Sequence, residues 1–250
     1  MLRQERHDYI LKKLNKLGKI ETTILAKELK VTEDTIRKDL QALEKEELIE
    51  RVYGGAFKRE NILSNFQERE EQFSDEKEYM SNQIAGLLLQ HKMIFIDSST
   101  TNQAIAERLV SQYAGTIFTN SPTIALELAK GENIDVHLLG GKLNKERLSI
   151  CDSQALKEIE TMNIECTLLG TAAVSLEHGI TNTDIEETIF KRELIVRSKK
   201  VVTAVVKNKL ETDGPYFVGS LDDIDLLITN EQKFDILEKY KEIGIEVLSV

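Results

Sequence analysis

Three apolar runs after residue 75 end in segments whose side chains and backbone can bind anions. These segments are Asp97-Ser98-Ser99-Thr100-Thr101, Thr119-Asn120-Ser121 and Gly140-Gly141. Hydroxyl groups next to free N–H groups at the start of a helix form an anion site. We therefore expect the segment 98–101 to hold a phosphate group and Asp97 to hold a sugar hydroxyl. The alternative is that these serines and threonines only cap a helix.

A second group of polar residues lies on one side of a short helix expected near residues 31–43. Ile36, Leu40 and Leu43 recur at helical spacing, so they form one apolar stripe. Arg37, Lys38 and other polar side chains point away from that stripe, and Thr32 is a suitable N-cap. Such a helix can enter the major groove of DNA. An ordinary surface helix with a solvated polar face has the same pattern.

The preceding residues predict the rest of a helix-turn-helix, at about residues 20–43. A helix is expected over residues 3–17, and a shorter one over 23–29 begins at a threonine cap, Thr22 or Thr23. After the third helix, the alternation in residues 48–57 and its Gly-Gly pair predict a β-hairpin, or wing. Arg51 and Tyr53 of this hairpin are candidate phosphate contacts. The candidate DNA-binding residues are Thr22, Thr32, Thr35, Arg37, Lys38, Gln41, Arg51 and Tyr53.

Residues 76–250 alternate short apolar runs with helical patterns. Continuous apolar strands that alternate with helices predict a mainly parallel sheet covered on both faces. Ligands in such sheets bind at the carboxyl ends of the strands. The expected organisation is a winged helix-turn-helix over residues 1–57, a polar linker over 58–75, and an α/β domain over 76–250.

Charge is distributed unevenly along the chain, which has a net charge of -10. Residues 1–60 contain 14 Lys and Arg against 12 Asp and Glu, so the remainder has a net charge of -12. A near-neutral head on an acidic body fits DNA binding by placed cations and by an oligomer. The sequence contains no membrane span or signal peptide, which predicts a cytoplasmic protein. The spacing of its cysteines and histidines predicts no metal site, and we expect no cofactor.

Residues 1–57 resemble the winged-helix head of the DeoR family of bacterial transcriptional regulators. The resemblance rests on the run Thr35-Ile36-Arg37-Lys38-Asp39-Leu40 and on Arg51-Val52-Tyr53-Gly54-Gly55-Ala56. Residues 76–230 resemble the effector domain of the same family, which is related in fold to ribose-5-phosphate isomerase. This resemblance implies that Glu187, Lys191 and Lys209 belong to the effector site.

The candidate effector-binding residues, from the strand ends and from the resemblance together, are Asp97, Ser98, Ser99, Thr100, Thr101, Thr119, Asn120, Gly140, Gly141, Glu187, Lys191 and Lys209. The chain differs from the usual family pattern at three positions. The family usually has glycine in place of Ser99 and Asp152, and aspartate in place of Val206. Loss of a glycine prevents close backbone approach, and Asp152 adds a negative charge near the expected phosphate.

The main hypothesis is a repressor of sugar-metabolism genes that binds operator DNA as a homodimer or homotetramer and responds to a phosphorylated sugar. One alternative is a sugar-phosphate isomerase that uses Asp97, Glu187 and Lys209 as acid or base groups. A second alternative is a constitutive DNA binder whose effector pocket has lost its function.

Overall fold

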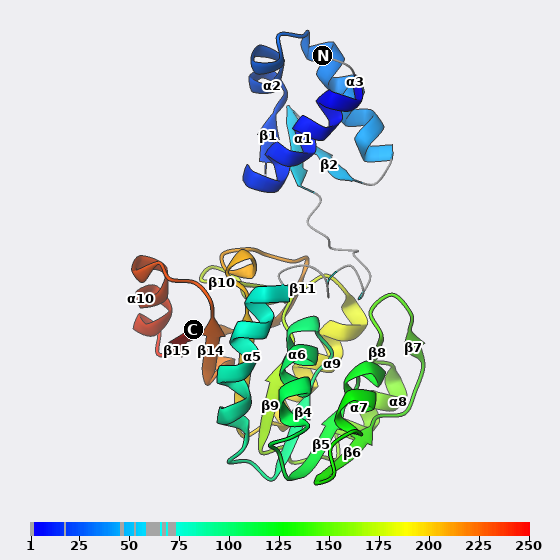
Figure 1. The fold of residues 1–250 in the computed structure, drawn as a ribbon, viewed down its shortest axis with the longest axis vertical. Helices are drawn as coiled ribbons and strands as arrows, with labels where there is room; N and C mark the ends of the chain where they lie inside the picture. The colour runs from blue at the N-terminus through cyan, green and yellow to red at the C-terminus, as the bar shows by residue number, and fades with distance from the viewer. Residues whose placement is uncertain are drawn as a thin grey trace. The chain divides into compact units, whose positions relative to one another are not determined.

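A computed structural model describes residues 3–17, 19–45, 48–52, 54–58, 66, 69 and 74–250. The chain divides into two compact units, Met1–Leu63 and Ser64–Val250, and Figure 1 shows the helices and strands of each. None of the helices in the described part of the chain is long and apolar enough to cross a membrane.

The first unit is a winged helix-turn-helix, as the sequence predicts. Its elements are α1 (Arg3–Leu17), β1 (Lys19–Glu21), α2 (Thr22–Leu29), α3 (Glu33–Lys45), β2 (Ile49–Val52) and β3 (Gly55–Lys58). Strands β2 and β3 form the predicted hairpin around Gly54, whose φ of 91° suits glycine. Strand β1, which the sequence analysis did not predict, completes an antiparallel sheet of order β1-β3-β2.

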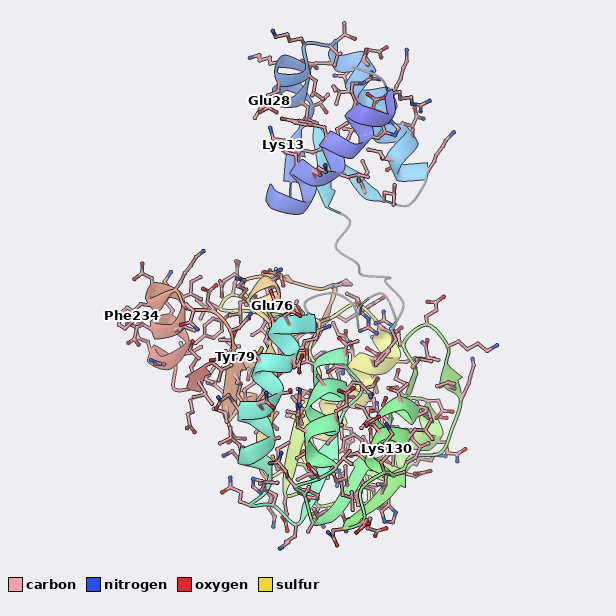
Figure 2. All side chains as sticks on the ribbon, viewed as in Figure 1. Lys13, Glu28, Glu76, Tyr79, Lys130 and Phe234 are labelled. Carbon is pink, nitrogen blue, oxygen red and sulfur yellow. The ribbon has the colours of Figure 1, made fainter. Side chains whose placement is uncertain are left out.

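The core of this unit consists of one apolar side from each helix. Ile10 and Leu14 of α1 are buried with Leu25 of α2 and Ile36 and Leu40 of α3. At about 2 kcal/mol for each buried aliphatic side chain, this small core is the main stabilising contribution in the unit. At the surface, the side chains of Lys13 and Glu28 form an ion pair between α1 and α2 (Figure 2).

The second unit is built on a seven-stranded sheet of order β15-β14-β12-β9-β4-β5-β6. All six neighbouring pairs are parallel, so the prediction of a mainly parallel sheet is confirmed. The strands are β4 (Met93–Ile96), β5 (Gly115–Thr119), β6 (Ile134–Leu138), β9 (Cys166–Leu169), β12 (Val201–Val205), β14 (Leu226–Thr229) and β15 (Glu246–Ser249). Each of them coincides with or overlaps one of the apolar runs in the sequence.

Helices cover both faces of this sheet and bury two separate apolar layers. They are α5 (Ser74–Leu88), α6 (Thr100–Leu109), α7 (Pro122–Leu128), α8 (Ser153–Ile159), α9 (Ile185–Arg197) and α10 (Phe234–Glu242). The layer under α5, α6 and α7 contains Ile94 and Ile96, whereas Phe95 between them packs in the other layer with Phe190 of α9. In Figure 1, α5 and α6 lie in front of the sheet.

Two smaller sheets are not predicted by the sequence analysis. One is a hairpin of β7 (Leu143–Asn144) and β8 (Ser149–Ile150), and the other contains β10 (Ala173–Ser175), β11 (Gly179–Asn182) and β13 (Tyr216–Gly219). These strands are short, so their alternation is too brief to stand out in the sequence.

The strand order creates a topological switch point between β4 and β9. Strands β5 and β6 follow β4 toward one edge of the sheet, whereas β12, β14 and β15 follow β9 toward the other edge. The connections therefore diverge at the carboxyl ends of β4 and β9, which is where ligands commonly bind in such sheets. Asp97 follows β4 directly and Gly170 follows β9 directly.

Candidate functional site

Helix α3 presents the exposed polar face that the sequence predicts. Thr32 Oγ1 accepts a hydrogen bond from the Thr35 N–H at 3.2 Å, so Thr32 caps the helix. The side chains of Arg37 and Lys38 are 63% and 75% exposed, and Gln41 is exposed as well. The face therefore offers two cations and an amide to a groove of DNA.

Both cations are paired within the helix. Arg37 Nη2 lies 3.2 Å from Glu33 Oε2, and Lys38 Nζ lies 2.9 Å from Asp34 Oδ2. The hydrogen bond to Asp34 raises the pKa of Lys38, so this side chain is a cation near neutral pH. Exposed pairs of this kind contribute less than about 1 kcal/mol, and DNA phosphates or base edges can replace the carboxylates.

The remaining candidate DNA contacts fall into two groups. Thr22 is only 4% exposed, and its N–H donates to Gly54 O at 2.9 Å. It therefore joins α2 to the wing, and its side chain is not available on the surface of this unit. Arg51 lies in β2, but its side chain lies outside the described part of the structure, as does the whole of Tyr53.

Asp39 is a structural residue of α3 that the sequence analysis did not single out. Its carboxylate is buried and accepts from Arg6 Nε at 2.7 Å and Arg6 Nη2 at 3.1 Å. His7 Nε2 lies 3.3 Å from the same group. This bidentate ion pair fixes α3 to α1, and the spacing of Asp39 from Ile36 in the sequence already places it near the apolar stripe.

Asp97 is at the centre of the polar site in the second unit. The carboxylate is 1% exposed. Oδ1 accepts from Asn120 Nδ2 at 3.1 Å, whereas Oδ2 accepts from Gly170 N–H at 3.0 Å and forms an ion pair with Lys191. Burial raises the pKa of Asp97, and the Lys191 ammonium opposes this shift. The sequence predicts a sugar-hydroxyl ligand here, but the structure gives the carboxylate three protein partners.

Asn120 and Gly170 hold the segment 98–101 in place. Asn120 Oδ1 accepts from the Ser98 N–H at 2.8 Å. A Cβ added to Gly170 would lie 2.9 Å from both Ser98 O and Ser99 Cβ, so β9 can approach the segment this closely only with glycine. The sequence predicts neither contact, because the partners are 22 or more residues apart.

The segment 98–101 forms the start of α6, as predicted. Ser99 Oγ accepts from the Asn102 N–H at 3.0 Å, so this hydroxyl is the helix cap that the alternative interpretation proposed. Thr100 and Thr101 are buried in the first turn, and Ser98 is half-buried. First-turn N–H groups lack acceptors within a helix and carry partial positive charge, so they can bind an anion.

Thr119 has a structural position at the end of β5. Its hydroxyl donates to Ile96 O at 2.6 Å and accepts from the Ser121 N–H at 3.1 Å, with no exposed surface. These bonds join β5 to β4 and begin α7. Thr119 therefore positions the neighbouring Asn120, and its hydroxyl is already occupied.

The two glycines after β6 pack closely against the start of α8. Gly141 has a φ of 139°, and a Cβ there would lie 2.3 Å from Asp152 Oδ1. A Cβ on Gly140 would lie 2.9 Å from the Gln154 amide nitrogen. Asp152 caps α8 and accepts from the Lys142 N–H at 3.0 Å. Its charge is therefore already bound by backbone N–H groups, which lower its pKa.

Glu187 occupies the first turn of α9 and contacts two neighbouring elements. It accepts from Ser149 Oγ and from Asn182 Nδ2, both at 3.2 Å. Arg147 Nη1, from the loop between β7 and β8, lies 3.6 Å from its carboxylate. The Lys191 and Arg147 cations hold the pKa of Glu187 below its ordinary value although burial opposes them.

Lys209 enters the site from the 3-10 helix Lys207–Lys209. Its Nζ donates to Thr171 O at 3.0 Å. Burial, together with the nearby cations Arg69, Lys77 and Lys191, lowers the pKa of Lys209 to about 7. Burial is the larger cause, so the lowered pKa marks Lys209 as a desolvated lysine beside other cations, a combination found at functional sites.

Arg69 and Arg147 belong to this site, but the sequence analysis did not include them. Arg69 interacts electrostatically with Glu187 and Arg147, and its Nε is buried without a hydrogen-bond partner. Lys77 of α5 donates from Nζ to Arg69 O and so fixes the backbone at that point. Nearby, Phe66 is buried and its N–H donates to Glu146 O at 2.8 Å. Phe66 and Arg69, which lie within the predicted linker, therefore contact the second unit.

The cations of this site outnumber its carboxylates among the described residues. We define the basic cluster as Arg69, Arg147, Lys191 and Lys209. The carboxylates near it are Asp97, Asp184 and Glu187. Burial of cations is costly in free energy, and a bound anion would lower that cost. In the part of the chain that the structure describes, no group of acidic, histidine and cysteine side chains is suited to a metal ion.

A helix-turn-helix that exposes Arg37 and Lys38, joined to an α/β unit with a buried cluster of charged side chains, is typical of a DNA-binding regulator with a sensor domain. The DeoR-like helix-turn-helix domain matches residues 6–60, and the DeoR C terminal sensor domain matches residues 72–231. The chain belongs to the DeoR family of transcriptional regulators, and it is a regulator rather than an enzyme.

Relatives with similar sequences are also named as regulators. The HTH-type transcriptional repressor GlcR of Bacillus subtilis is 33% identical and aligns over 99% of this chain and 96% of its own. The HTH-type transcriptional regulator GolR of Listeria innocua is 30% identical over 97% of each chain. The glycerol-3-phosphate regulon repressor of Escherichia coli is 26% identical over 92% of each.

Ribose 5 phosphate isomerase A from Neisseria gonorrhoeae is one of the solved structures with a weak similarity to this chain. It matches 54% of this chain and 55% of its own, with a TM-score of 0.37 and a sequence identity of 11%.

Proposed function

We propose that this protein is a transcriptional repressor that binds operator DNA through α3 and is controlled by a phosphorylated sugar bound beside the basic cluster. It acts in the cytoplasm as a homodimer or homotetramer. GlcR and the glycerol-3-phosphate regulon repressor are named as repressors, which supports the direction of control.

The burial of the basic cluster, whose cations outnumber the described carboxylates beside them, is the observation that carries the proposal. A phosphate group that is fully ionised has two negative charges, so it would offset the unmatched positive charge. The first turn of α6 supplies N–H groups and the positive end of a helix dipole. The Lys209 ammonium and the Arg69 guanidinium can each donate hydrogen bonds to phosphate oxygens.

The sugar itself would lie toward α9. Glu187 is a half-buried carboxylate with a lowered pKa, so it is ionised and can accept hydrogen bonds from hydroxyl groups. Asp97 and Asn120 would position the phosphate-binding segment rather than contact the ligand, because their polar atoms already have protein partners.

Arg69 provides a route from ligand to DNA. It precedes α5 and follows the helix-turn-helix unit, which ends at Leu63. A bound phosphate would draw the Arg69 guanidinium toward itself, while Lys77 holds the Arg69 carbonyl oxygen. Ligand binding would then bias the conformational equilibrium of the chain at Arg69, as a population shift requires.

The test is a thermal-shift panel of phosphorylated sugars, each with its unphosphorylated counterpart. We expect stabilisation by at least one phosphosugar and by none of the free sugars. Lys209→Met should remove the shift, whereas Lys130→Met, a change at an exposed lysine on α7's C-terminal side, should retain it. DNA from upstream of the protein's own gene should bind wild type and be released by the same phosphosugar.

The panel also distinguishes the alternatives. A protein that binds this DNA but responds to no phosphosugar would be a constitutive DNA binder, and the sensing part of the proposal would be wrong. Stabilisation by unphosphorylated sugars alone would show that the basic cluster does not bind phosphate. Ser99, where the family usually has glycine, would then be the first residue to examine.

A further inference from the structure

Helix α9 exposes an apolar stripe on the side opposite to its buried residues. The stripe consists of Ile185, Ile189, Arg192 and Val196, which recur at helical spacing along one side. Ile185 is 49% exposed, Ile189 47% and Val196 72%. A single exposed aliphatic residue is common on a protein surface, but three on one stripe of a 13-residue helix are not explained by the fold.

The neighbouring strand β13 extends this apolar surface. Phe217 is 51% exposed, and the Arg192 guanidinium lies 5.7 Å from the centre of its ring. Arg192 Nε also donates to Phe217 O at 3.0 Å. These contacts hold Arg192 along the aromatic ring, so the stripe and Phe217 form one continuous surface. Surfaces that combine aliphatic, aromatic and arginine side chains are typical of protein interfaces.

The charges at the two ends of α9 indicate what covers this surface. The exposed Glu186 lies in the first turn, whereas Arg197 ends the helix, where it pairs with Glu193, and Lys199 and Lys200 follow it. A second α9 packed antiparallel would place each acidic end against a basic end, with opposed helix dipoles. Parallel packing would bring like charges together. The helix is therefore complementary to itself in the antiparallel direction.

We propose that the α9 stripe and Phe217 form the interface with a second copy of this chain, in which the two α9 helices pack antiparallel. With the symmetry axis midway between residues 190 and 191, Ile185 of one copy faces Val196 of the other, and Ile189 faces Arg192. Such an interface is isologous, because each copy uses the same surface. The choice of a second copy also rests on the proposed function, since paired heads bind paired half-sites.

The interface has a direct connection to the basic cluster. Lys191 and Glu187 lie on the buried side of the same helix. A ligand that moves α9 through these residues would change the angle between the two copies. The α9 interface would therefore couple ligand binding at the sensor site to the spacing of the two heads.

The first test measures the mass of the full chain by sedimentation equilibrium, without DNA or ligand. We expect wild type to associate and Ile189→Asp to shift toward the 28.4 kDa monomer. Leu126→Asp is the matched control, because Leu126 is 73% exposed on α7, and it should associate like wild type. Unchanged association of Ile189→Asp, or a monomeric wild type, would overturn the proposal. Neither result depends on whether a phosphosugar binds.

The second test determines the direction of packing and does not depend on loss of assembly. The Ile185→Cys and Val196→Cys variants are oxidised separately, and again as a mixture after co-expression. Wild type is oxidised in parallel to measure any linkage through its own Cys151 and Cys166 thiols. Antiparallel packing predicts disulfide-linked dimers only in the co-expressed sample. Dimers formed by either variant alone, or none in the mixture, would contradict the arrangement.

Discussion

The affinity for a phosphosugar should fall as the pH rises above 7, because Lys209 must be charged to bind the phosphate. In the unliganded protein, burial and the cations Arg69, Lys77 and Lys191 lower the pKa of Lys209 to about 7. A bound phosphate dianion would raise the pKa of Lys209, because its negative charge stabilises the ammonium form. Binding above pH 7 therefore takes up about one proton at Lys209.

The pKa sets the size of this effect. About half of the unliganded molecules have a charged Lys209 at pH 7, whereas about 1 in 100 do at pH 9. The apparent dissociation constant should therefore rise about 50-fold between these values, or about 2.3 kcal/mol. The second ionisation of a phosphate monoester lies near pH 6, so the ligand keeps its charge over this range.

The assay is isothermal titration calorimetry at several pH values with the phosphosugar that stabilises the protein most. Buffers with different ionisation enthalpies report the proton uptake directly. Lys209→Met should bind more weakly at pH 7 and lose the pH dependence. Lys207→Met, a change at an exposed lysine of the same 3-10 helix, should retain it. Equal affinity at pH 7 and pH 9, or a pH dependence that survives in Lys209→Met, would refute this account of the site.

Three further predictions concern the head. The double variant Arg37→Ala, Lys38→Ala should bind operator DNA at least tenfold more weakly, because about 1–3 kcal/mol is lost with each specific base contact. A mobility-shift titration at fixed salt measures this affinity. Wild-type affinity of the variant would rule out α3 as the helix that reads the DNA. The fragment 1–63 should bind more weakly than the full chain, since a single head lacks the avidity of an oligomer; equal affinity in the same titration would show that assembly is irrelevant. Asp39→Ala should destabilise the head by about 3 kcal/mol, because it leaves the Arg6 guanidinium and His7 without their buried carboxylate; urea unfolding followed by circular dichroism checks this, and a change below about 0.5 kcal/mol would show that the ion pair is not needed.

Local patterns in the sequence were sufficient to predict the helices, the strands of the parallel sheet and part of each site. Helical spacing of Ile36, Leu40 and Leu43 determines which side of α3 is buried, and thus which side exposes Arg37. Continuous apolar runs mark all seven strands of the parallel sheet. These properties depend on residues a few positions apart, so periodicity reports them directly.

The effector contacts predicted at the strand ends stay predictions. Thr119, Asp97 and Asn120 are polar residues in the expected places, and their polar atoms also form bonds to the protein. Ser99 is a helix cap, which was the open alternative. Residue type alone cannot distinguish a group that binds a ligand from one that holds the binding segment, because both must be polar and buried.

Only the tertiary structure decided which distant residues meet. Asp97 and Lys191 are 94 positions apart, and Arg69 and Arg147 interact electrostatically with Glu187 from much earlier in the chain. The order of the strands brings these residues together, and that order depends on which apolar faces pack together rather than on any local pattern. The sequence by itself determined that a polar segment suited to the start of a helix follows β4. The folded chain determined that buried cations lie near that segment, where burial removes the water that would otherwise screen each charge.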